Sequence, residues 1–205
     1  MAHADTAHAG HGTAQAGESR HGHAVGQSDK KIALLISVLT LFVALSETFG
    51  KASQTSALSY NVEATDLWAF QQAKTLRAAT LRTAADALQL DLVATGDPAA
   101  KAAMQKRIDS WQKDAARYES EPSSNEGSRE LTARAEEAEH KRDTALASYH
   151  HYEIASGALS IGIVLASASV ITGIIALAYI AGGLGVLGLA FMTIGLFAPH
   201  AVHLF

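Results

Sequence analysis

The sequence predicts an all-α membrane protein in which a long antiparallel helical hairpin separates an N-terminal transmembrane helix from a C-terminal pair of spans. Three observations lead to this fold class. The last 52 residues, Ile154 to Phe205, contain no Asp, Glu, Lys or Arg, although 18% of the whole chain is charged. A second apolar run begins at Ile32. The region between them is rich in Ala, Leu, Glu, Gln, Lys and Arg, which favour helix.

Residues 1–31 form a tail of Ala, Gly, His, Ser and Thr without apolar periodicity, and we expect it to be disordered. It carries five histidines: His3, His8, His11, His21 and His23. Imidazole nitrogens bind zinc, copper and nickel, but no carboxylate or thiolate is fixed beside these histidines and their spacing matches no defined site. The tail therefore predicts weak metal binding at most, with a solvated low-complexity segment as the alternative, and we expect no cofactor.

The first predicted span covers residues 32–49, which are free of charge up to Glu47. At about 1.5 Å per residue it would be ~27 Å long, close to the ~30 Å thickness of the hydrocarbon layer. A signal peptide cleaved near Ala44-Leu45-Ser46 is the alternative. The polar segment before the apolar run is unusually long for a secretory signal, so a retained anchor is favoured.

Residues 50–153 are expected to form three helices outside the membrane. The first runs from about Ser53 to Thr95, where Gly96-Asp97-Pro98 stops it, the second from Ala99 to about Glu119, and the third from Ser128 without a break into the next apolar run. The outgoing arm, taken from Lys51 to Thr95, would measure ~68 Å and the two returning helices together ~70 Å. These lengths predict a coiled-coil-like hairpin kinked near Pro122; a three-helix head with a bent first arm is the alternative. The outgoing arm also carries a stripe of mostly small residues: Ala69, Ala73, Leu76, Thr80, Ala84 and Leu88.

The charge-free C-terminal segment is predicted to form two spans, 154–180 and 184–205, joined by a turn at Ala181-Gly182-Gly183. Small residues recur at helical spacing on each span: Gly162, Ala166 and Gly173 on the first, and Gly185, Gly188 and Gly195 on the second. Such residues allow two helix backbones to approach closely in lipid, which predicts a tight hairpin. The alternative is that glycine is simply common in membrane helices.

Basic residues near the spans predict the orientation only by a small margin. Lys30 and Lys31 precede the first span, whereas Lys51, Arg134, Lys141 and Arg142 lie on its other side. Because the first span often dominates, we expect the N-terminus in the cytoplasm and the hairpin on the opposite side.

Several classes of function are not expected from this composition. The chain has no cysteine and a net charge of −4, so thiolate chemistry and nucleic-acid binding are not predicted. No phosphate-binding loop, nucleophile elbow or metalloprotease motif occurs. The predicted spans contain no charge that could mark an ion path, and we expect neither an enzyme nor a transporter. A structural or protein-interaction role remains, with a protein partner or a homo-oligomer; a metal-binding or sensing protein that uses the histidine tail is the alternative.

One stretch of the outgoing arm is more specific than helical periodicity requires. Asn61 to Lys74 contains the pattern Asp-x-Trp-Ala-aromatic-x-Gln-Ala-Lys, in which the characteristic residues are Asp66, Trp68, Phe70, Gln71 and Lys74. With Tyr118-Glu119 and the approach to Ile161–Ser167, the chain over about residues 30–198 resembles the bacterial family of membrane proteins called domain of unknown function 4337. The resemblance implies the same three-span plan in a bacterial inner membrane and no known activity. It also implies basic residues between the last two spans, where this chain has only Gly182-Gly183.

The motif itself predicts a packing cluster. Trp68 and Phe70 lie on adjacent faces of the helix, and Asp66, Gln71 and Lys74 can make polar contacts around them. We expect Trp111 of the second helix to be their partner, so that a buried aromatic cluster holds the hairpin together; a ligand site is the alternative.

Overall fold

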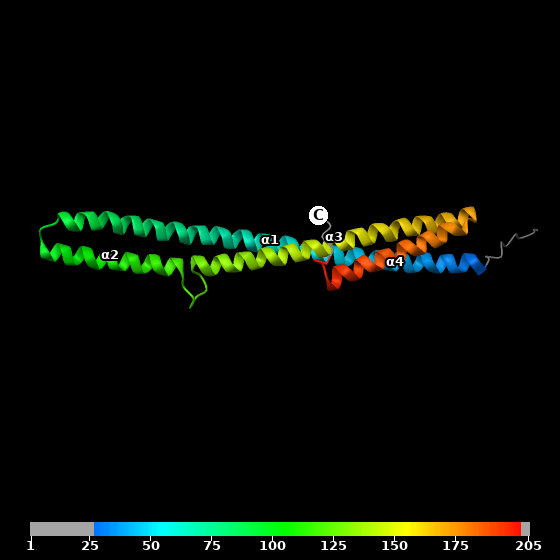
Figure 1. Cartoon of the computed structure of the whole chain (residues 1–205), viewed down its shortest axis with the longest axis horizontal. Helices are drawn as coiled ribbons and strands as arrows, with labels where there is room; N and C mark the ends of the chain where they lie inside the picture. Colours follow the sequence, from blue (N-terminus) through cyan, green and yellow to red (C-terminus); the bar gives the residue numbers. More distant parts are fainter. Residues whose placement is uncertain (1–26, 202–205) are drawn as a thin grey trace, which may run out of the picture.

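The computed structural model describes residues 27–201, which form four helices and no strand (Figure 1). They are α1 (Gln27–Ala94), α2 (Pro98–Glu119), α3 (Ser128–Thr172) and α4 (Ile175–Phe197). α1 is one uninterrupted helix of 68 residues, about 100 Å long at 1.5 Å per residue. Its apolar start and its polar arm are therefore a single rod, with no break at the expected boundary at Gly50.

α2 and α3 return along α1 one after the other, so the kinked hairpin is present and the three-helix head is not. α1 packs against both helices, whereas α2 and α3 barely touch one another. Figure 1 shows α2 beside the far part of α1, then the connecting loop, then α3 beside the remainder. The breaks fall where the sequence predicts them. Asp97 caps α2 by accepting a hydrogen bond from the Ala99 amide (3.0 Å), and Pro98 occupies the first turn.

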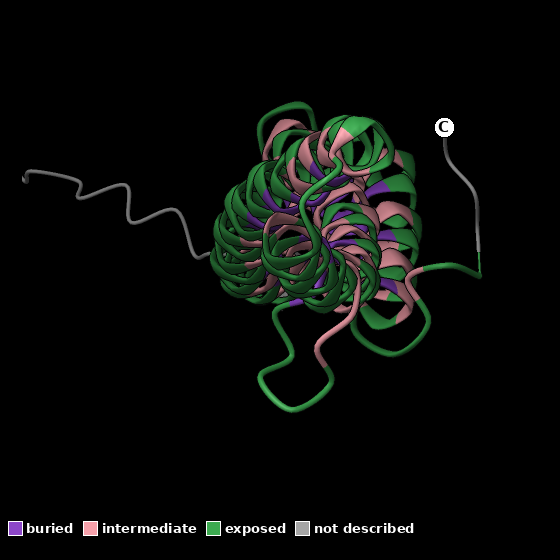
Figure 2. Cartoon of the chain, turned by 90° about the vertical axis from the view of Figure 1, so that its left-hand side faces the viewer, coloured by how far each residue is buried: buried purple, intermediate pink, exposed green. Residues whose placement is uncertain are grey.

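The buried face of α1 repeats every seven residues along the helix. Its buried members recur at spacings of three, four and seven: Leu39, Ser46, Gly50, Ala57, Ala64, Leu67, Lys74, Ala78 and Ala85. The predicted small-residue stripe does not lie on this face. Ala69, Ala73, Leu76 and Thr80 are exposed, while Ala84 and Leu88 are half-buried. In the end-on view of Figure 2 the buried residues lie along the inner seams and the exposed ones cover the outside.

The apolar ends of α1 and α3 join α4 in a three-helix bundle. α1, α3 and α4 are each long and apolar enough to cross a membrane. α3 contacts both α1 and α4 extensively, whereas α1 and α4 touch little. The apolar part of α3 spans residues 154–172 and α4 spans Ile175–Phe197, about 28 Å and 34 Å of helix respectively.

The turn between the last two spans is at Gly173-Ile174, so the prediction of Ala181-Gly182-Gly183 was wrong. Gly173 ends α3 in the left-handed conformation (φ 70°), and its amide donates to the Ser169 carbonyl (2.9 Å). The Ser169 hydroxyl donates to the Ile174 carbonyl (3.0 Å) and closes the turn. Gly182 and Gly183 lie within α4. A glycine pair does not stop a helix in lipid, because no water competes for the backbone hydrogen bonds.

The limits of the two C-terminal spans change accordingly. α4 begins nine residues before the predicted start of the last span, at Ile175, and it ends at Phe197 rather than continuing to Phe205. After α4 the chain reaches back to α3. The Pro199 carbonyl lies 3.0 Å from His151 Nε2, and His200 Nε2 lies 3.0 Å from the Thr144 hydroxyl.

Candidate functional site: the junction of α2 and α3 on α1

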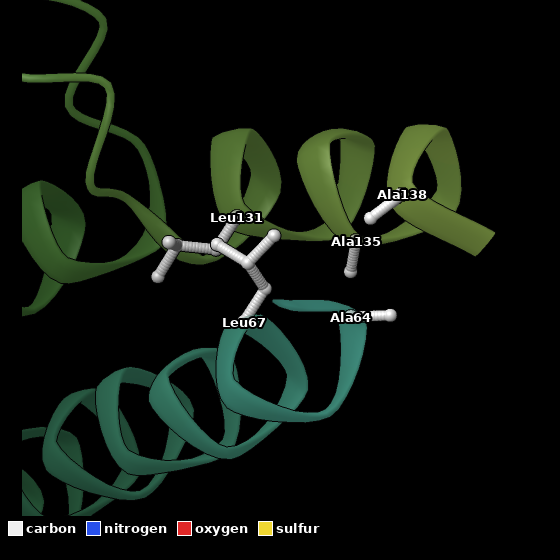
Figure 3. Close-up of a cluster of buried hydrophobic side chains, with 5 residues drawn as sticks. All are labelled: Ala64, Leu67, Leu131, Ala135 and Ala138. Carbon is white, nitrogen blue, oxygen red and sulfur yellow. The ribbon is translucent and has the colours of Figure 1, made fainter. Parts of the chain in front are cut away.

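The motif residues of α1 lie where α2 ends and α3 begins. A small apolar core joins α1 to α3 there. Figure 3 shows Leu67 and Ala64 of α1 facing Leu131, Ala135 and Ala138 of α3. Leu131 and Ala135 are completely buried, and Trp68 packs against the cluster while its indole Nε1 donates to Glu139 Oε1 (3.0 Å). The indole thus combines apolar burial with a satisfied polar group.

Lys74 links three elements at this junction. Its side chain is only 9% exposed, although it carries a charge. The ammonium lies 5.1 Å from the centre of the Phe70 ring on α1 and 5.5 Å from that of Tyr118 at the end of α2. It also lies 3.7 Å from Glu126 Oε2 in the connection. Two aromatic faces and one carboxylate therefore compensate the cost of removing the ammonium from water.

Gln71 fixes the start of α3 beside α1. Its amide Nε2 donates to the Ser128 hydroxyl (2.9 Å) and to the Thr75 hydroxyl (3.1 Å). The two hydroxyls are also 3.0 Å apart. The side chains of Gln71 and Thr75 on α1 thus contact the side chain of the first residue of α3.

Glu130 and Gly127 shape the connection between α2 and α3. The Glu130 carboxylate accepts hydrogen bonds from the Ser120 hydroxyl (2.7 Å) and the Glu121 amide (3.2 Å), and the bond from Ser120 holds its pKa below the usual value. Gly127 is buried against the same segment. A Cβ there would overlap the Glu121 nitrogen, the Ser120 Cα and the Glu130 carboxylate. The loop therefore closes tightly only with glycine at this position.

Two of the predicted motif residues are less enclosed. Asp66 is exposed on α1, and Phe70 is 39% exposed although Lys74 lies over its ring. Trp111 is not the partner of Trp68. It is half-buried further along α2, with the Arg107 guanidinium 4.9 Å from its ring centre. Along α2 it lies between Met104, which accepts a hydrogen bond from Thr95 in the connection after α1, and Glu119, which pairs with Arg82 of α1.

The partners of the motif come from residues that the periodicity of α3 did not single out. Glu139 and Glu126 belong to polar stretches whose composition predicts only a solvated surface. Ser128 is predicted only as the first residue of a helix. The one signal for them is position: the returning chain must bring residues just after the break at Pro122 beside the motif. Tyr118, in contrast, does belong to the pattern on which the family resemblance rests.

Five of the six small residues predicted to pack the apolar bundle lie at its helix contacts. Gly162, Ala166, Gly185, Gly188 and Gly195 are all buried. A Cβ at Gly188 would come 2.6 Å from Leu159 Cγ and 3.1 Å from the Ala155 carbonyl oxygen; one at Gly185 would come 2.8 Å from Leu39 Cδ2. Gly173 is the exception, because it is exposed and caps α3 instead of packing.

A groove of about 340 Å³ lies where the apolar bundle meets the arm. α1 contributes Ser46, Glu47, Gly50, Lys51 and Gln54, and α3 contributes Tyr149, Tyr152, Glu153 and Ser156. The Ser46 hydroxyl donates to the Tyr152 carbonyl (2.8 Å) and ties the two helices together beside it. Within residues 30–201, no group of three or more His, Asp and Glu could hold a metal ion. The five tail histidines lie outside the described residues.

Comparison with known proteins gives one result. No curated protein and no solved structure matches the chain. The family model described as "Domain of unknown function (DUF4337)" matches residues 28–198, which include all four helices except one residue at the start of α1. This confirms the resemblance that the motif around Trp68 predicts. The chain belongs to the DUF4337 family.

Proposed function

We propose that this protein is a membrane-anchored scaffold that presents its long helical arm to other protein chains. The observation that carries the proposal is the outer face of α1. Leu76, Leu90 and Val93 are 69%, 75% and 80% exposed on the part of α1 that lies beside α2. Apolar surface that continues along an exposed helix is typical of an interaction site.

The outer face of α2 provides the contrast. Its exposed residues include many charges, namely Lys101, Lys106, Arg107, Asp109 and Lys113. A charged face of this kind is what a helix in water normally shows. Where α1 and α2 lie side by side, the large exposed apolar side chains are on α1, and α2 exposes none, which favours a specific contact of α1.

The lipid bilayer is the first partner in this proposal. The outside of the three-helix bundle is covered by exposed apolar side chains, among them Val164, Ile171 and Val186 at 66%, 85% and 70% exposure. Contact of these side chains with lipid carries no free-energy cost, whereas their exposure to water is unfavourable. We place the bundle in a bacterial inner membrane, with the N-terminus in the cytoplasm and the arm on the opposite side.

A scaffold needs an arm of fixed length, and two features support one here. The seven-residue repeat on the inner face of α1 is the pattern of helices that wrap around each other in coiled coils. Lys74 contacts Tyr118 at the end of α2 and Glu126 in the connection, and Gln71 contacts Ser128 at the start of α3, so both returning helices are held to α1 near the middle of the arm. These contacts favour a structural role without catalysis.

A photo-crosslinking residue placed on the outer face of α1 tests the proposal. We expect Leu90→benzoylphenylalanine in the full-length protein to give crosslinked species of discrete mass in native membranes. The matched control is Lys113→benzoylphenylalanine on the charged outer face of α2, which should give none. Absence of discrete crosslinks from position 90, or equal yields from both positions, would contradict the proposed role.

A further inference from the structure

We propose that the exposed face of α1 pairs with the same face of a second copy of this chain, with the two helices parallel and in register. This inference rests on the proposed function, because it names the partner of the arm. It uses three observations: a second seven-residue repeat, its lack of charge, and the alignment that a shared membrane imposes.

The second repeat is a stripe that we call the outer stripe. Its members recur at alternating spacings of four and three, and all are exposed: Ala69, Ala73, Leu76, Thr80, Thr83, Ala87, Leu90 and Ala94. The inner face of α1 repeats with the same period on the side that packs against α2 and α3. α1 thus carries two apolar seams, and the structure provides a partner for only the inner one within residues 27–201 (Figure 1).

The outer stripe is apolar even where it contains threonine. The Thr80 hydroxyl donates to the Leu76 carbonyl (2.8 Å) and the Thr83 hydroxyl donates to the Ala79 carbonyl (3.0 Å). Both hydroxyls are therefore satisfied by their own helix, and the methyl groups can face a partner. Large Leu76 and Leu90 alternate with small neighbours, and a shallow groove is lined by Leu76, Ala79, Thr80, Thr83, Ala84 and Ala87. Large residues next to small ones allow two helices to interlock.

The size of the outer stripe favours a partner held in the same membrane. The stripe is about 40 Å long and roughly 10 Å wide, so a pair of copies would bury ~800 Å² in total. This is slightly below the ~1,000 Å² expected of a stable complex between free proteins. Copies anchored in one bilayer are already concentrated and oriented, which reduces the entropic cost of pairing. A second copy meets this condition by its own three apolar helices.

The membrane also decides the direction of the pair. All copies inserted in the same orientation project their arms to the same side, so two α1 helices must run parallel. Equivalent residues then lie opposite each other, since each copy starts from the same bilayer surface. In a parallel pair, Asp86 of one copy lies near Asp91 of the other, five residues further along. In an antiparallel pair centred on Ala84, Arg77 would face Asp91 instead. Asp91 therefore meets a like charge in the parallel pair and an opposite charge in the antiparallel pair.

Single-cysteine crosslinking tests the inference directly, because the natural chain contains no cysteine. Ala73→Cys, Thr80→Cys and Ala87→Cys would be made as three separate full-length variants and oxidised in native membranes. A parallel, in-register pair brings each of these positions within disulfide range of its equivalent, for which Cα atoms must be less than about 7 Å apart. We expect a disulfide-linked dimer from all three variants. Gln105→Cys and Lys113→Cys on α2 are the matched exposed controls and should stay monomeric.

The outcomes separate this inference from the proposed function. Dimers from only one stripe position would indicate an antiparallel or crossing contact and overturn the inference. No dimer from any stripe position, with discrete crosslinks to another protein from position 90, would overturn the inference and leave the scaffold role intact. Asp91→Asn adds an independent readout in the Thr80→Cys background. It should raise dimer yield at least twofold by removing repulsion from Asp86, whereas a fall in yield would contradict parallel pairing.

Discussion

Replacing Gly188 by valine is expected to destabilise the apolar bundle strongly. The Cβ alone would lie 2.6 Å from Leu159 Cγ and 3.1 Å from the Ala155 carbonyl oxygen, and the valine methyl groups would extend further. Leu159 is completely buried, so it has little room to move away. Overpacking of this kind costs about 3 kcal/mol, and here it would separate α4 from α3.

The measurement is unfolding of the purified protein in mixtures of a mild detergent and sodium dodecyl sulfate, followed by circular dichroism. Gly183→Val is the matched control on the same helix, because no heavy atom lies within 4 Å of a Cβ built there. It should unfold close to the wild-type midpoint. Equal destabilisation by both substitutions would mean that α4 does not present its Gly188 face to α3.

Replacing Lys74 by alanine is expected to loosen the junction that joins α2 and α3 to α1. The change removes an ammonium that contacts two aromatic rings and Glu126, together with its buried stem. With about 0.5–2 kcal/mol for each cation–π contact and a further contribution from the lost stem, we expect a cost of about 3 kcal/mol. Backbone amides of residues 118–131 should then exchange hydrogen much faster, while those of the apolar bundle stay protected.

Two further variants separate charge from packing at Lys74. Lys74→Met keeps an unbranched stem of similar length and removes only the charge, so it should cost less than alanine but still speed exchange around the connection. Lys113→Ala removes an exposed lysine from α2 and should have no effect. Wild-type exchange in Lys74→Met would show that the stem alone holds the junction.

The helix limits in the arm could be predicted because local chemistry sets them. Asp97-Pro98 begins α2 through a cap and a proline in the first turn, and the break after Glu119 contains Pro122 and ends at Ser128. The predicted lengths then favoured an arrangement in which α2 and α3 share the surface of α1, over a three-helix head with a bent first arm. The kinked hairpin follows from these positions without any knowledge of tertiary contacts.

The inner face of α1 could not be predicted from apolar spacing, because polar and small residues interrupt it. Ser46, Gly50 and Lys74 are all buried there. Each is compensated by a contact that only the folded structure provides, such as the hydrogen bond from Ser46 to the Tyr152 carbonyl. The alanine-rich stripe that the sequence displays most clearly is expected to remain exposed, and four of its six members, Ala69, Ala73, Leu76 and Thr80, are exposed. Apolar periodicity therefore indicated a face of α1 that lies outside its contacts with α2 and α3.

The turn between α3 and α4 escaped prediction for a different reason. A glycine pair is a stronger break signal in water than a single glycine, which favoured Gly182-Gly183 over Gly173. In the bundle the deciding interactions are the left-handed conformation of Gly173 and the hydrogen bond from Ser169 to the Ile174 carbonyl. The predicted partner of the motif is wrong for a similar reason. Residue type favours Trp111, whereas the antiparallel register places Glu139 beside Trp68.

α1 is one continuous helix, and we propose that it carries the arm away from the membrane. A single distance tests it: spin labels on Ser56→Cys and Gln89→Cys, two exposed positions on α1, measured by double electron–electron resonance in lipid. An excess of unlabelled protein would restrict the signal to labels within one chain. The account predicts one narrow distribution near 50 Å, from 1.5 Å of rise per residue. A broad distribution, or a main distance below about 35 Å, would show that the arm bends back on itself and would contradict the continuous helix.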